Sequence, residues 1–250
     1  MTIRVGIGGW TYEPWRGTFF PPGLSHAREL AHAARRVTAI EVNGTYYGRQ
    51  KPATFANWAK TVPDGFVFSL KASRFCTNRK ILADAGESVA NFLGQGLTEL
   101  GDKLGPILWQ FAATKRFEPD DFAAFLKLLP ETQDGLPLAH AIEARHESFD
   151  VPEFRDMVRA AGAAIVYADA RDHPQLSDLA GPFVYARLQD QHEEEPAGYS
   201  PSALDGWADE ARTWAEGGRD VFVFMINGAK VRAPAAAEAL QQRLGIMPLT

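Results

Sequence analysis

The chain has 250 residues, of which 46% are hydrophobic and 23% charged, values that suit a large buried core and exclude intrinsic disorder. The formal net charge of -5 and the scattered Lys and Arg residues do not favour long-range attraction to nucleic acid or to anionic lipid. Cys76 is the only cysteine, which excludes an internal disulfide and any multi-thiolate metal site within one chain.

The first residues, MTIRVGIGG, already have the pattern of a strand, with no basic and apolar leader before it. No run of about 18 apolar residues occurs that would cross a membrane. We therefore expect a cytoplasmic protein that does not contact membranes. Because no linker or repeat interrupts the chain, we expect residues 1–250 to form a single domain.

Eight short apolar runs recur along the chain, each with the length and composition of a β-strand. These runs are 3–9, 38–44, 66–72, 105–111, 139–145, 164–169, 182–188 and 221–227. Stretches with helical periodicity lie between them, at 25–36, 119–129, 152–161, 201–216 and 234–244. Strands that alternate with helices predict a parallel sheet.

Eight such units fit either a closed barrel or an open doubly wound sheet. The glycines of the first unit, Gly6, Gly8 and Gly9, lack the GxGxxG spacing of a dinucleotide-binding sheet. We therefore predict an α/β fold, a single (β/α)8 TIM-type barrel. Segment 74–100 has room for more than one helix, whereas segment 170–181 leaves little room for one.

Polar side chains gather at the carboxyl ends of the predicted strands, where barrel enzymes carry their active sites. Side chains alternate along a strand, so Glu41 and Asn43 share one face, as do Glu143 and Arg145. The other strands after the first are predicted to add Lys71, Gln110, Asp169, Arg187 and Asn227. Because unpaired buried charges are costly, we expect a mutually compensating polar cluster. The alternative is that these groups only hydrogen-bond one another or cap loops.

Several motifs occur in a fixed order along nearly the whole chain. They are GIGGWTYEPWRGTFFP at 6–21, a longer segment at 39–72, GPILWQF at 105–111, HAIEARHESF at 140–149, YARL at 185–188 and a final segment at 198–244. Together they resemble the YecE-like family, the domain of unknown function 72 (DUF72). This resemblance implies a TIM-type barrel without an established activity.

The resemblance also implies which residues of this chain occupy the family's site positions. Its polar positions fall on Glu41, Asn43, Lys71, Gln110, Glu143, Arg145, His146 and Arg187, and its aromatic wall on Trp10, Tyr12, Trp15 and Tyr46. Gln189 and Asp190 stand where the family usually has a His-Gly pair, and Ile226 with Asn227 where it has paired Asn. These departures imply an altered specificity or a reduced activity.

Several chemistries fit the cluster. Lys71, Arg145 and Arg187 suit a phosphorylated or carboxylated substrate, unless they pair internally with Glu41 and Glu143. The two glutamates are candidates for a general acid and base, as in glycoside cleavage or proton abstraction beside a carbonyl. Lys71 is alternatively a candidate for Schiff-base formation. The substrate-binding candidates are Asn43, Gln110, Arg145, His146, Arg187, Asn227, Trp10, Tyr12 and Tyr46.

Histidines on the predicted strand-to-helix loops are candidates for metal ligands. These are His146, His173 and His192, with Glu143 or Asp169 as partners. No pair of them has HxH or HxxxH spacing, so we expect no metal and no cofactor.

Three hypotheses for the function follow. The first is an enzyme that acts by acid–base chemistry on a small anionic or sugar-like molecule. The second is a non-catalytic barrel that binds a nucleotide, a nucleic-acid end or a metabolite, with salt-dependent binding and no turnover. The third is a metal-assisted enzyme similar to barrel phosphoesterases and sugar isomerases, which rests on fold-level likeness. The substrate, the reaction and the oligomeric state are left open.

Overall fold

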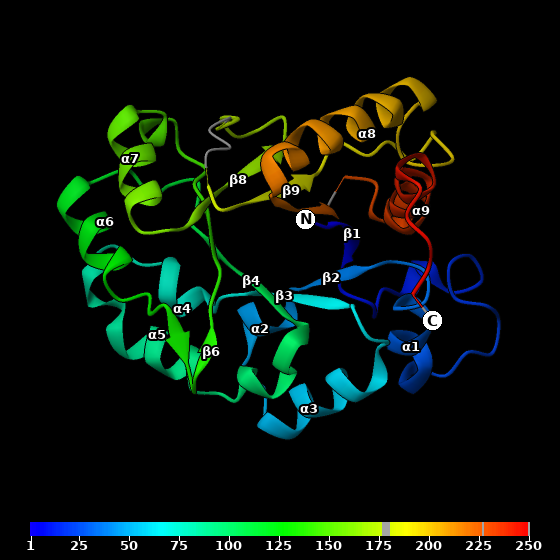
Figure 1. Cartoon of the computed structure of the whole chain (residues 1–250), viewed down its shortest axis with the longest axis horizontal. Coiled ribbons are helices and arrows are strands. Elements are labelled where there is room, and N and C mark those ends of the chain that lie inside the picture. Colours follow the sequence, from blue (N-terminus) through cyan, green and yellow to red (C-terminus); the bar gives the residue numbers. More distant parts are fainter. Residues whose placement is uncertain (177–180, 227, 250) are drawn as a thin grey trace.

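The computed structural model describes residues 1–176, 181–226 and 228–249. Eight parallel strands close into a barrel in the order β1-β10-β9-β8-β7-β4-β3-β2 (Figure 1). They are β1 (Ile3–Gly8), β2 (Ala39–Val42), β3 (Val67–Lys71), β4 (Leu104–Gln110), β7 (His140–Glu143), β8 (Ala164–Asp169), β9 (Phe183–Leu188) and β10 (Asp220–Met225). Each overlaps one predicted run, so the prediction of a (β/α)8 barrel is confirmed.

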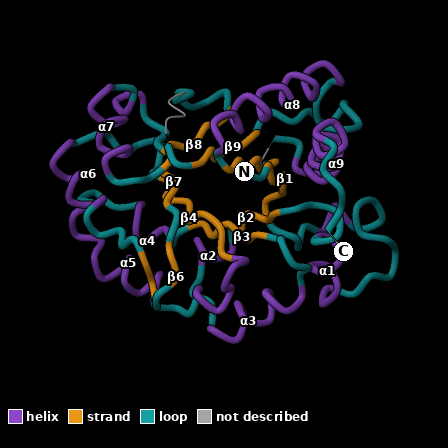
Figure 2. Tube along the Cα trace, viewed as in Figure 1, coloured by secondary structure: helices purple, strands orange, loops and turns teal. Residues whose placement is uncertain are grey.

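Helices surround the ring of strands (Figure 2). They are α1 (Glu29–Ala33), α2 (Gly44–Tyr47), α3 (Pro52–Thr61), α4 (Arg74–Thr77), α5 (Gly86–Leu93), α6 (Pro119–Leu126), α7 (Pro152–Ala160), α8 (Pro201–Ala215) and α9 (Ala233–Leu244). Short 3-10 turns complete the connections: η1 (Glu13–Trp15), η2 (His26–Arg28), η3 (Ala83–Ala85), η4 (Leu97–Lys103), η5 (Glu147–Phe149), η6 (Glu216–Gly218) and η7 (Lys230–Arg232). Segment 74–100 therefore holds two α-helices, and the described residues of 170–181 hold none.

Local sequence explains where several helices begin. Pro52, Pro119, Pro152 and Pro201 each occupy the first helical position of α3, α6, α7 and α8. Proline suits this position because its fixed φ matches the helix and its missing N–H would have no helical partner there. The strand-to-helix transitions are thereby set by residues that lie outside the barrel interior.

An antiparallel pair of strands outside the barrel was not predicted. It consists of β5 (Thr132–Gln133) and β6 (Leu136–Pro137), which lie between α6 and β7. Asp134 and Gly135 form its turn with φ values of 49° and 80°. An Asp-Gly pair with positive φ is the usual choice for a two-residue hairpin turn, so this dipeptide was the signal that the sequence contained.

Alternation along the strands divides the core into an outer and an inner layer. Outward-facing side chains such as Ile40 and Leu70 pack beneath the helices. Inward-facing side chains such as Val67, Tyr185 and Phe224 fill the amino-terminal part of the barrel interior. β1 contributes a glycine there because a Cβ on Gly6 would lie 2.2 Å from the carbonyl oxygen of the neighbouring β2 residue.

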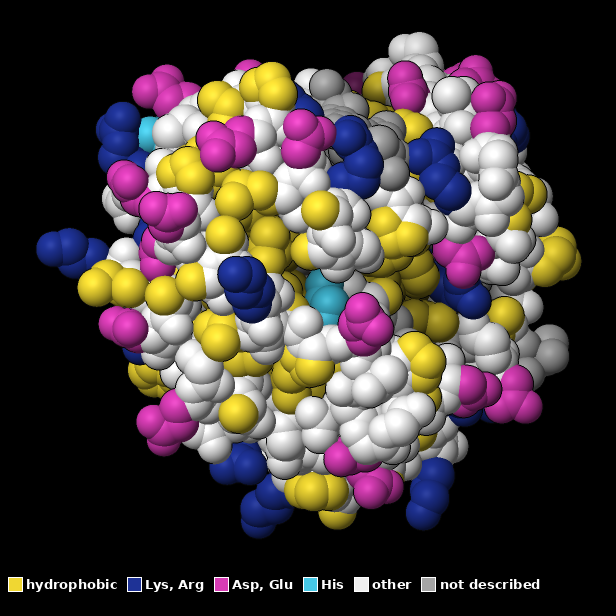
Figure 3. Space-filling model, turned by 60° about the vertical axis from the view of Figure 1, so that its left-hand side comes forward, with side chains coloured by type: hydrophobic (Ala, Val, Ile, Leu, Met, Phe, Trp, Pro, Cys, Tyr) yellow, Lys and Arg dark blue, Asp and Glu magenta, His cyan; other side chains and the backbone are white. Residues whose placement is uncertain are grey.

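Charged and hydrophobic side chains share the surface that Figure 3 draws. On the face drawn in Figure 3, acidic and basic side chains are intermixed with hydrophobic ones. Within the described residues, no helix is long and apolar enough to cross a membrane. A cluster of buried charged groups lies inside the barrel, at the carboxyl ends of the strands.

Candidate active site

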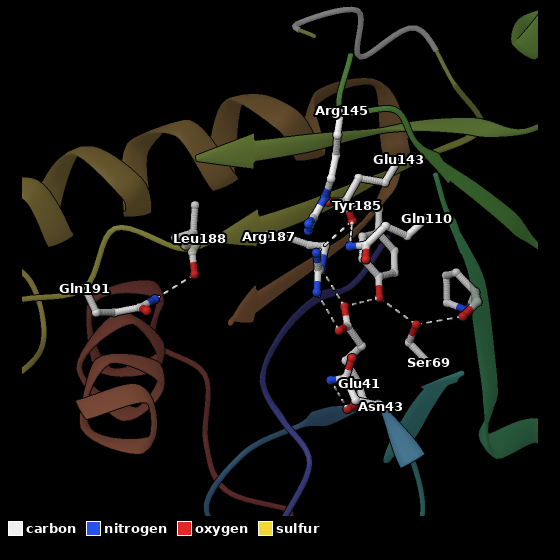
Figure 4. A network of polar contacts seen from close by, with 11 residues as sticks. Glu41, Asn43, Ser69, Gln110, Glu143, Arg145, Tyr185, Arg187, Leu188 and Gln191 are labelled. Carbon is white, nitrogen blue, oxygen red and sulfur yellow. Dashed lines mark hydrogen bonds and ion pairs between the residues drawn. The ribbon is translucent and has the colours of Figure 1, made fainter. Parts of the chain in front are cut away.

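A buried ion-pair layer crosses the barrel interior at the carboxyl ends of β2, β7 and β9 (Figure 4). Arg187 Nε and Nη2 donate to Oε2 and Oε1 of Glu41, each at 3.0 Å, and Arg187 Nη1 donates to Glu143 Oε2 at 2.7 Å. The side chains of Arg187, Glu41 and Glu143 are only 2%, 0% and 1% exposed. One guanidinium therefore pairs with two carboxylates that the solvent does not reach.

Neighbouring side chains donate further hydrogen bonds to the oxygen atoms of the two carboxylates. Arg145 Nε donates to Glu143 Oε1 at 2.7 Å, and Gln110 Nε2 donates to Glu143 Oε2 at 2.9 Å. The Tyr185 hydroxyl donates to Glu41 Oε2 at 2.8 Å and lies 2.7 Å from Ser69 Oγ. Tyr185 was not among the predicted site residues, although it lies two positions before Arg187 and so shares its face.

The charge of Glu143 is fixed by this arrangement. Burial alone would raise the pKa of its carboxyl, but the guanidiniums of Arg187 and Arg145 and the Gln110 amide outweigh burial and lower the pKa to about 2. Burial likewise opposes the charge of Arg187, and the two glutamates outweigh it and raise its pKa. Glu143 therefore stays ionised at neutral pH, which makes it a poor proton donor.

A cavity of about 380 Å³ opens on the solvent side of the ion-pair layer, and we call it the mouth cavity. Its described lining comprises Gly8, Trp15, Asn43, Tyr46, Tyr47, Lys71, Gln110, Arg145, Arg187, Met225, Ile226, Lys230 and Ala233. Every charged residue in this described lining is a cation, because Glu41 and Glu143 lie beneath it. The mouth cavity is therefore suited to a negatively charged ligand.

Lys71 stands at the end of β3 with its amine in the mouth cavity. Its Nζ lies 4.4 Å from the centroid of the Tyr46 ring, and no described carboxylate lies within 4 Å of this Nζ. Burial and the charge of Arg187 lower the pKa of Lys71 to about 8, against the opposing effect of Glu41 and Glu143. A fraction of the amine is therefore neutral near physiological pH, which proton abstraction and carbonyl attack both require.

We expect Lys71 to titrate near pH 8 rather than near 10.5. The measurement is trace acylation across a pH series, with the modified peptides quantified by mass spectrometry and the exposed Lys60 as a reference for reagent reactivity. In Arg145→Gln the pKa of Lys71 should rise, because that substitution removes a cation that disfavours the charged amine. A wild-type midpoint near 10 would refute the described environment of Lys71.

Not all of the predicted aromatic residues line the mouth cavity. Tyr46 and Trp15 do. Trp10 packs instead in the outer layer, with its ring centroid 5.2 Å from that of Trp58. Tyr12 packs edge-on against Trp15, 5.4 Å between centroids, and receives the ammonium of Lys230 over its ring at 4.6 Å. Tyr12 therefore contacts two residues that line the mouth cavity, Trp15 and Lys230, whereas Trp10 packs against Trp58 and Phe68.

The expectation that Asp169 points into the barrel mouth is wrong. Inward-facing residues of β8 have even numbers, such as Ala164 and Val166, so Asp169 falls on the helix side. There it accepts a hydrogen bond from the Tyr199 hydroxyl at 3.2 Å. It lines a larger cavity of about 890 Å³, which lies outside the barrel against α8 and has several carboxylates but no Lys or Arg in its described lining.

The predicted histidines lie apart from the mouth cavity. His146 Nδ1 lies 2.9 Å from Ser148 Oγ at the start of η5, and His173 lies beside Asp172. Within the described residues, no group of three or more His, Cys, Asp and Glu side chains is arranged to hold a metal ion. Asn227, a predicted binding residue, lies outside the described residues.

The departures from the family pattern and one missed residue also have places in the structure. Ile226 lines the mouth cavity, whereas Asp190 pairs with Arg171 at 2.6 Å outside it. Lys230, on η7 after β10, lines the mouth cavity and was not predicted. Burial lowers the pKa of Lys230. Strand alternation does not reach this residue because it follows the strand in a loop.

Comparison with known proteins places the chain in a family. The family model described as "Protein of unknown function DUF72" matches residues 4–249. A DUF72 family protein of Enterococcus faecalis V583 is 18% identical, with 98% of this chain and 96% of that chain covered and a TM-score of 0.76. A DUF72 family protein of Thermotoga maritima MSB8 is 22% identical, with 96% and 97% covered and a TM-score of 0.75.

A more distant likeness concerns an enzyme. The 3-keto-D-glucoside 4-epimerase of E. coli is 12% identical, with 98% of each chain covered and a TM-score of 0.53. At these identities the solved structures show a shared fold. No curated protein sequence matches the chain. Because the family model spans nearly its whole length, the chain belongs to the DUF72 family, as its motifs indicated.

Proposed function

We propose that this protein is an enzyme that binds a small anionic, sugar-like substrate in the mouth cavity and transfers a proton through Lys71. The observation that carries the proposal is the environment of Lys71, whose pKa is lowered to about 8 in a cavity with only cationic charges in its described lining. A neutral amine accepts a proton, and the surrounding cations stabilise the negative charge that develops.

The reaction that fits this environment is proton abstraction from a carbon beside a carbonyl. The neutral Lys71 amine takes the proton and becomes an ammonium, while the C–H electron pair moves to the carbonyl oxygen. Arg145 and Lys230, which also line the mouth cavity, are positioned to stabilise the resulting enolate. Return of this proton by Lys71 to the same face of that carbon regenerates the substrate, with exchange against solvent. Where that carbon also bears a hydroxyl group, transfer of the hydroxyl proton to the former carbonyl oxygen and of the Lys71 proton to the former carbonyl carbon gives an isomer.

The two glutamates have a positioning role in this proposal. Glu41 accepts from Tyr185 and twice from Arg187, and its side chain is 0% exposed, so a substrate has no access to it. Glu143 holds Arg187 and Arg145 in place and has a pKa of about 2. Both glutamates also moderate the pKa of Lys71, which would fall further without them.

The choice of a sugar-like substrate draws on the fold likeness to a sugar epimerase. The E. coli 3-keto-D-glucoside 4-epimerase has the same barrel over 98% of its length, at 12% identity. Hydroxyl groups of a sugar also suit the amides of Asn43 and Gln110 in the mouth cavity. The anionic group is required by the excess of cations.

The test is hydrogen exchange in heavy water. The protein is incubated with a panel of ketose phosphates, aldose phosphates and sugar acids, and deuterium incorporation is followed by NMR. We expect exchange at a carbon beside the carbonyl with at least one compound, and its loss in Lys71→Met. Binding without exchange or turnover across the panel would overturn the proposal in favour of a non-catalytic binding barrel. Equal exchange in Lys71→Met would remove Lys71 from the mechanism.

Arg145→Ala is expected to weaken binding of a phosphorylated sugar by about ten- to hundredfold, the scale of one or two charge-assisted hydrogen bonds. Its side chain is 19% exposed and keeps only its Nε on Glu143 among the described contacts, so its outer edge faces the mouth cavity. Isothermal titration calorimetry measures the change. Arg171→Ala is the matched control, since Arg171 pairs with Asp190 outside the mouth cavity. Equal affinities in wild type and Arg145→Ala would contradict the assignment.

A further inference from the structure

Exposed aromatic rings stand beside the mouth cavity. Among the described residues, the exposed large hydrophobic side chains are Met1, Tyr47, Phe75, Ile81 and Met247. Two of these lie near the chain ends, whereas the other three follow β2 and β3 at their carboxyl ends. Tyr47 and Phe75 are 69% and 62% exposed. Both rings line one cavity, where an exposed aromatic face is available to stack on a ligand.

A second cavity, of about 470 Å³, lies between α2, α4 and α5, and we call it the side cavity. Its described lining is Thr45, Tyr47, Gly48, Arg49, Ser73, Phe75, Glu87, Ser88, Asn91, Phe92 and Gln95. Tyr47 lines both this cavity and the mouth cavity. Its ring therefore stands where the two cavities adjoin, and a ligand longer than one cavity would pass over it.

The two cavities differ in charge. The charged residues in the described lining of the mouth cavity are Lys71, Arg145, Arg187 and Lys230, all cations. The side cavity has one cation, Arg49, and one carboxylate, Glu87, in its described lining, so it is close to neutral. A ligand that spans both cavities carries its negative charge in the mouth cavity and a neutral group in the side cavity.

The polar groups of the side cavity suit the edge of a heteroaromatic ring. Ser88 and Asn91 lie on α5, and the Asn91 amide offers both a donor and an acceptor. Tyr46 contacts the Tyr47 ring edge-on, with centroids 5.0 Å apart and an interplanar angle of 86°. An aromatic platform beside amide and guanidinium groups is the combination by which proteins stack and read a nucleobase.

We propose that the side cavity binds the base of a nucleotide whose phosphorylated sugar, bearing the carbonyl group that the proposed reaction needs, lies in the mouth cavity. The assignment rests on the proposed function, because it places the anionic, sugar-like part of the substrate beside Lys71. Tyr47 stacks on the base, and Asn91 hydrogen-bonds its edge. Each cavity has a volume within the range of about 300–1,000 Å³ that is usual for small-molecule sites.

The test compares matched ligands by isothermal titration calorimetry. Adenosine 5′-monophosphate and uridine 5′-monophosphate are the complete probes, and ribose 5-phosphate lacks only the base. We expect at least one nucleotide to bind about tenfold more tightly than ribose 5-phosphate, the scale of one stacked base. Tyr47→Ala should abolish this difference, and Asn91→Ala should reduce nucleotide binding without changing ribose 5-phosphate binding. Ile81→Ala, at an exposed residue outside both cavities, is the control and should change neither affinity.

The outcomes separate this inference from the proposed function. If ribose 5-phosphate binds in an Arg145-dependent way and neither nucleotide binds more tightly, the side cavity is not a base site, while the anion site stands. A nucleotide advantage that survives Tyr47→Ala and Asn91→Ala also overturns the inference. If none of the three probes binds, both this inference and the ribose phosphate placement in the mouth cavity are wrong.

Discussion

Arg187→Met is expected to lower the free energy of unfolding by about 3–5 kcal/mol, because it leaves two buried carboxylates without their shared counterion. Glu41 and Glu143 are 0% and 1% exposed, so in the folded barrel both carboxylates are sheltered from solvent. Arg187 also supplies three of the hydrogen bonds that these carboxylates accept. Urea unfolding followed by circular dichroism measures the change.

Two further variants make the Arg187 result interpretable. Arg171→Ala removes an ion pair whose arginine side chain is 71% exposed and should change stability by less than about 1 kcal/mol. The triple variant with Glu41→Leu, Glu143→Leu and Arg187→Met removes the three charges of the layer together. It should recover part of the lost stability, because Arg145 loses its pairing with Glu143 but keeps its edge toward the mouth cavity. A single Arg187→Met variant as stable as the wild type would contradict the described ion-pair layer.

Lys71→Met is expected to lower the exchange rate of the proposed reaction by about a hundredfold or more, the usual contribution of a positioned base. The same substitution should stabilise the protein by about 1–3 kcal/mol at pH 7, because burial disfavours the ammonium and lowers its pKa to about 8. Between pH 8 and 10.5, Lys71 is protonated in the unfolded chain but largely neutral in the folded protein. The contribution of Lys71 to the free energy of unfolding of the wild type therefore becomes more favourable as the pH rises from 8 to 10.5.

The stability gain from Lys71→Met should accordingly shrink as the pH rises through this window. Urea unfolding of both proteins at pH 7 and pH 9.5 measures it, and exchange in heavy water measures the activity. Lys230→Met serves as a comparison, since Lys230 lines the same cavity but is not assigned the proton transfer. A variant that loses both activity and stability would indicate that Lys71 holds the site together rather than acting as its base.

Strand alternation predicted much of the polar cluster at the barrel mouth, because the barrel imposes this alternation. Glu41, Lys71, Glu143 and Arg187 share the inward parity of their strands, and the structure brings them together. The same rule failed at Asp169 because the polar residue that ends β8 has the outward parity. Neighbouring residues of a strand point to opposite faces. A prediction that is wrong by one position therefore places a side chain inside the barrel when it actually faces the helices.

The sequence patterns could not predict which loop residues line the mouth cavity or how far apart the site side chains lie. Lys230 and Tyr47 follow their strands in segments without strand periodicity, so no pattern assigned them to a face. The roles of Glu41 and Glu143 depend on three hydrogen bonds from Arg187. The spacing of these residues in the sequence does not show that their side chains meet in this way. Two carboxylates in one barrel suggest an acid and a base, whereas the structure shows that both hydrogen-bond the same guanidinium and that the pKa of Glu143 is lowered to about 2.

The ion-pair layer also has a consequence for how the barrel folds. Its three members lie on β2, β7 and β9, so the two carboxylates belong to the first two thirds of the chain and their counterion to the last third. A nascent or truncated chain that ends before β9 would have to bury Glu41 and Glu143 without Arg187, at a cost of several kcal/mol. Such a chain therefore keeps these strands open to water. We therefore expect closure of the barrel and formation of the charged layer to be one cooperative step, without stable partial barrels.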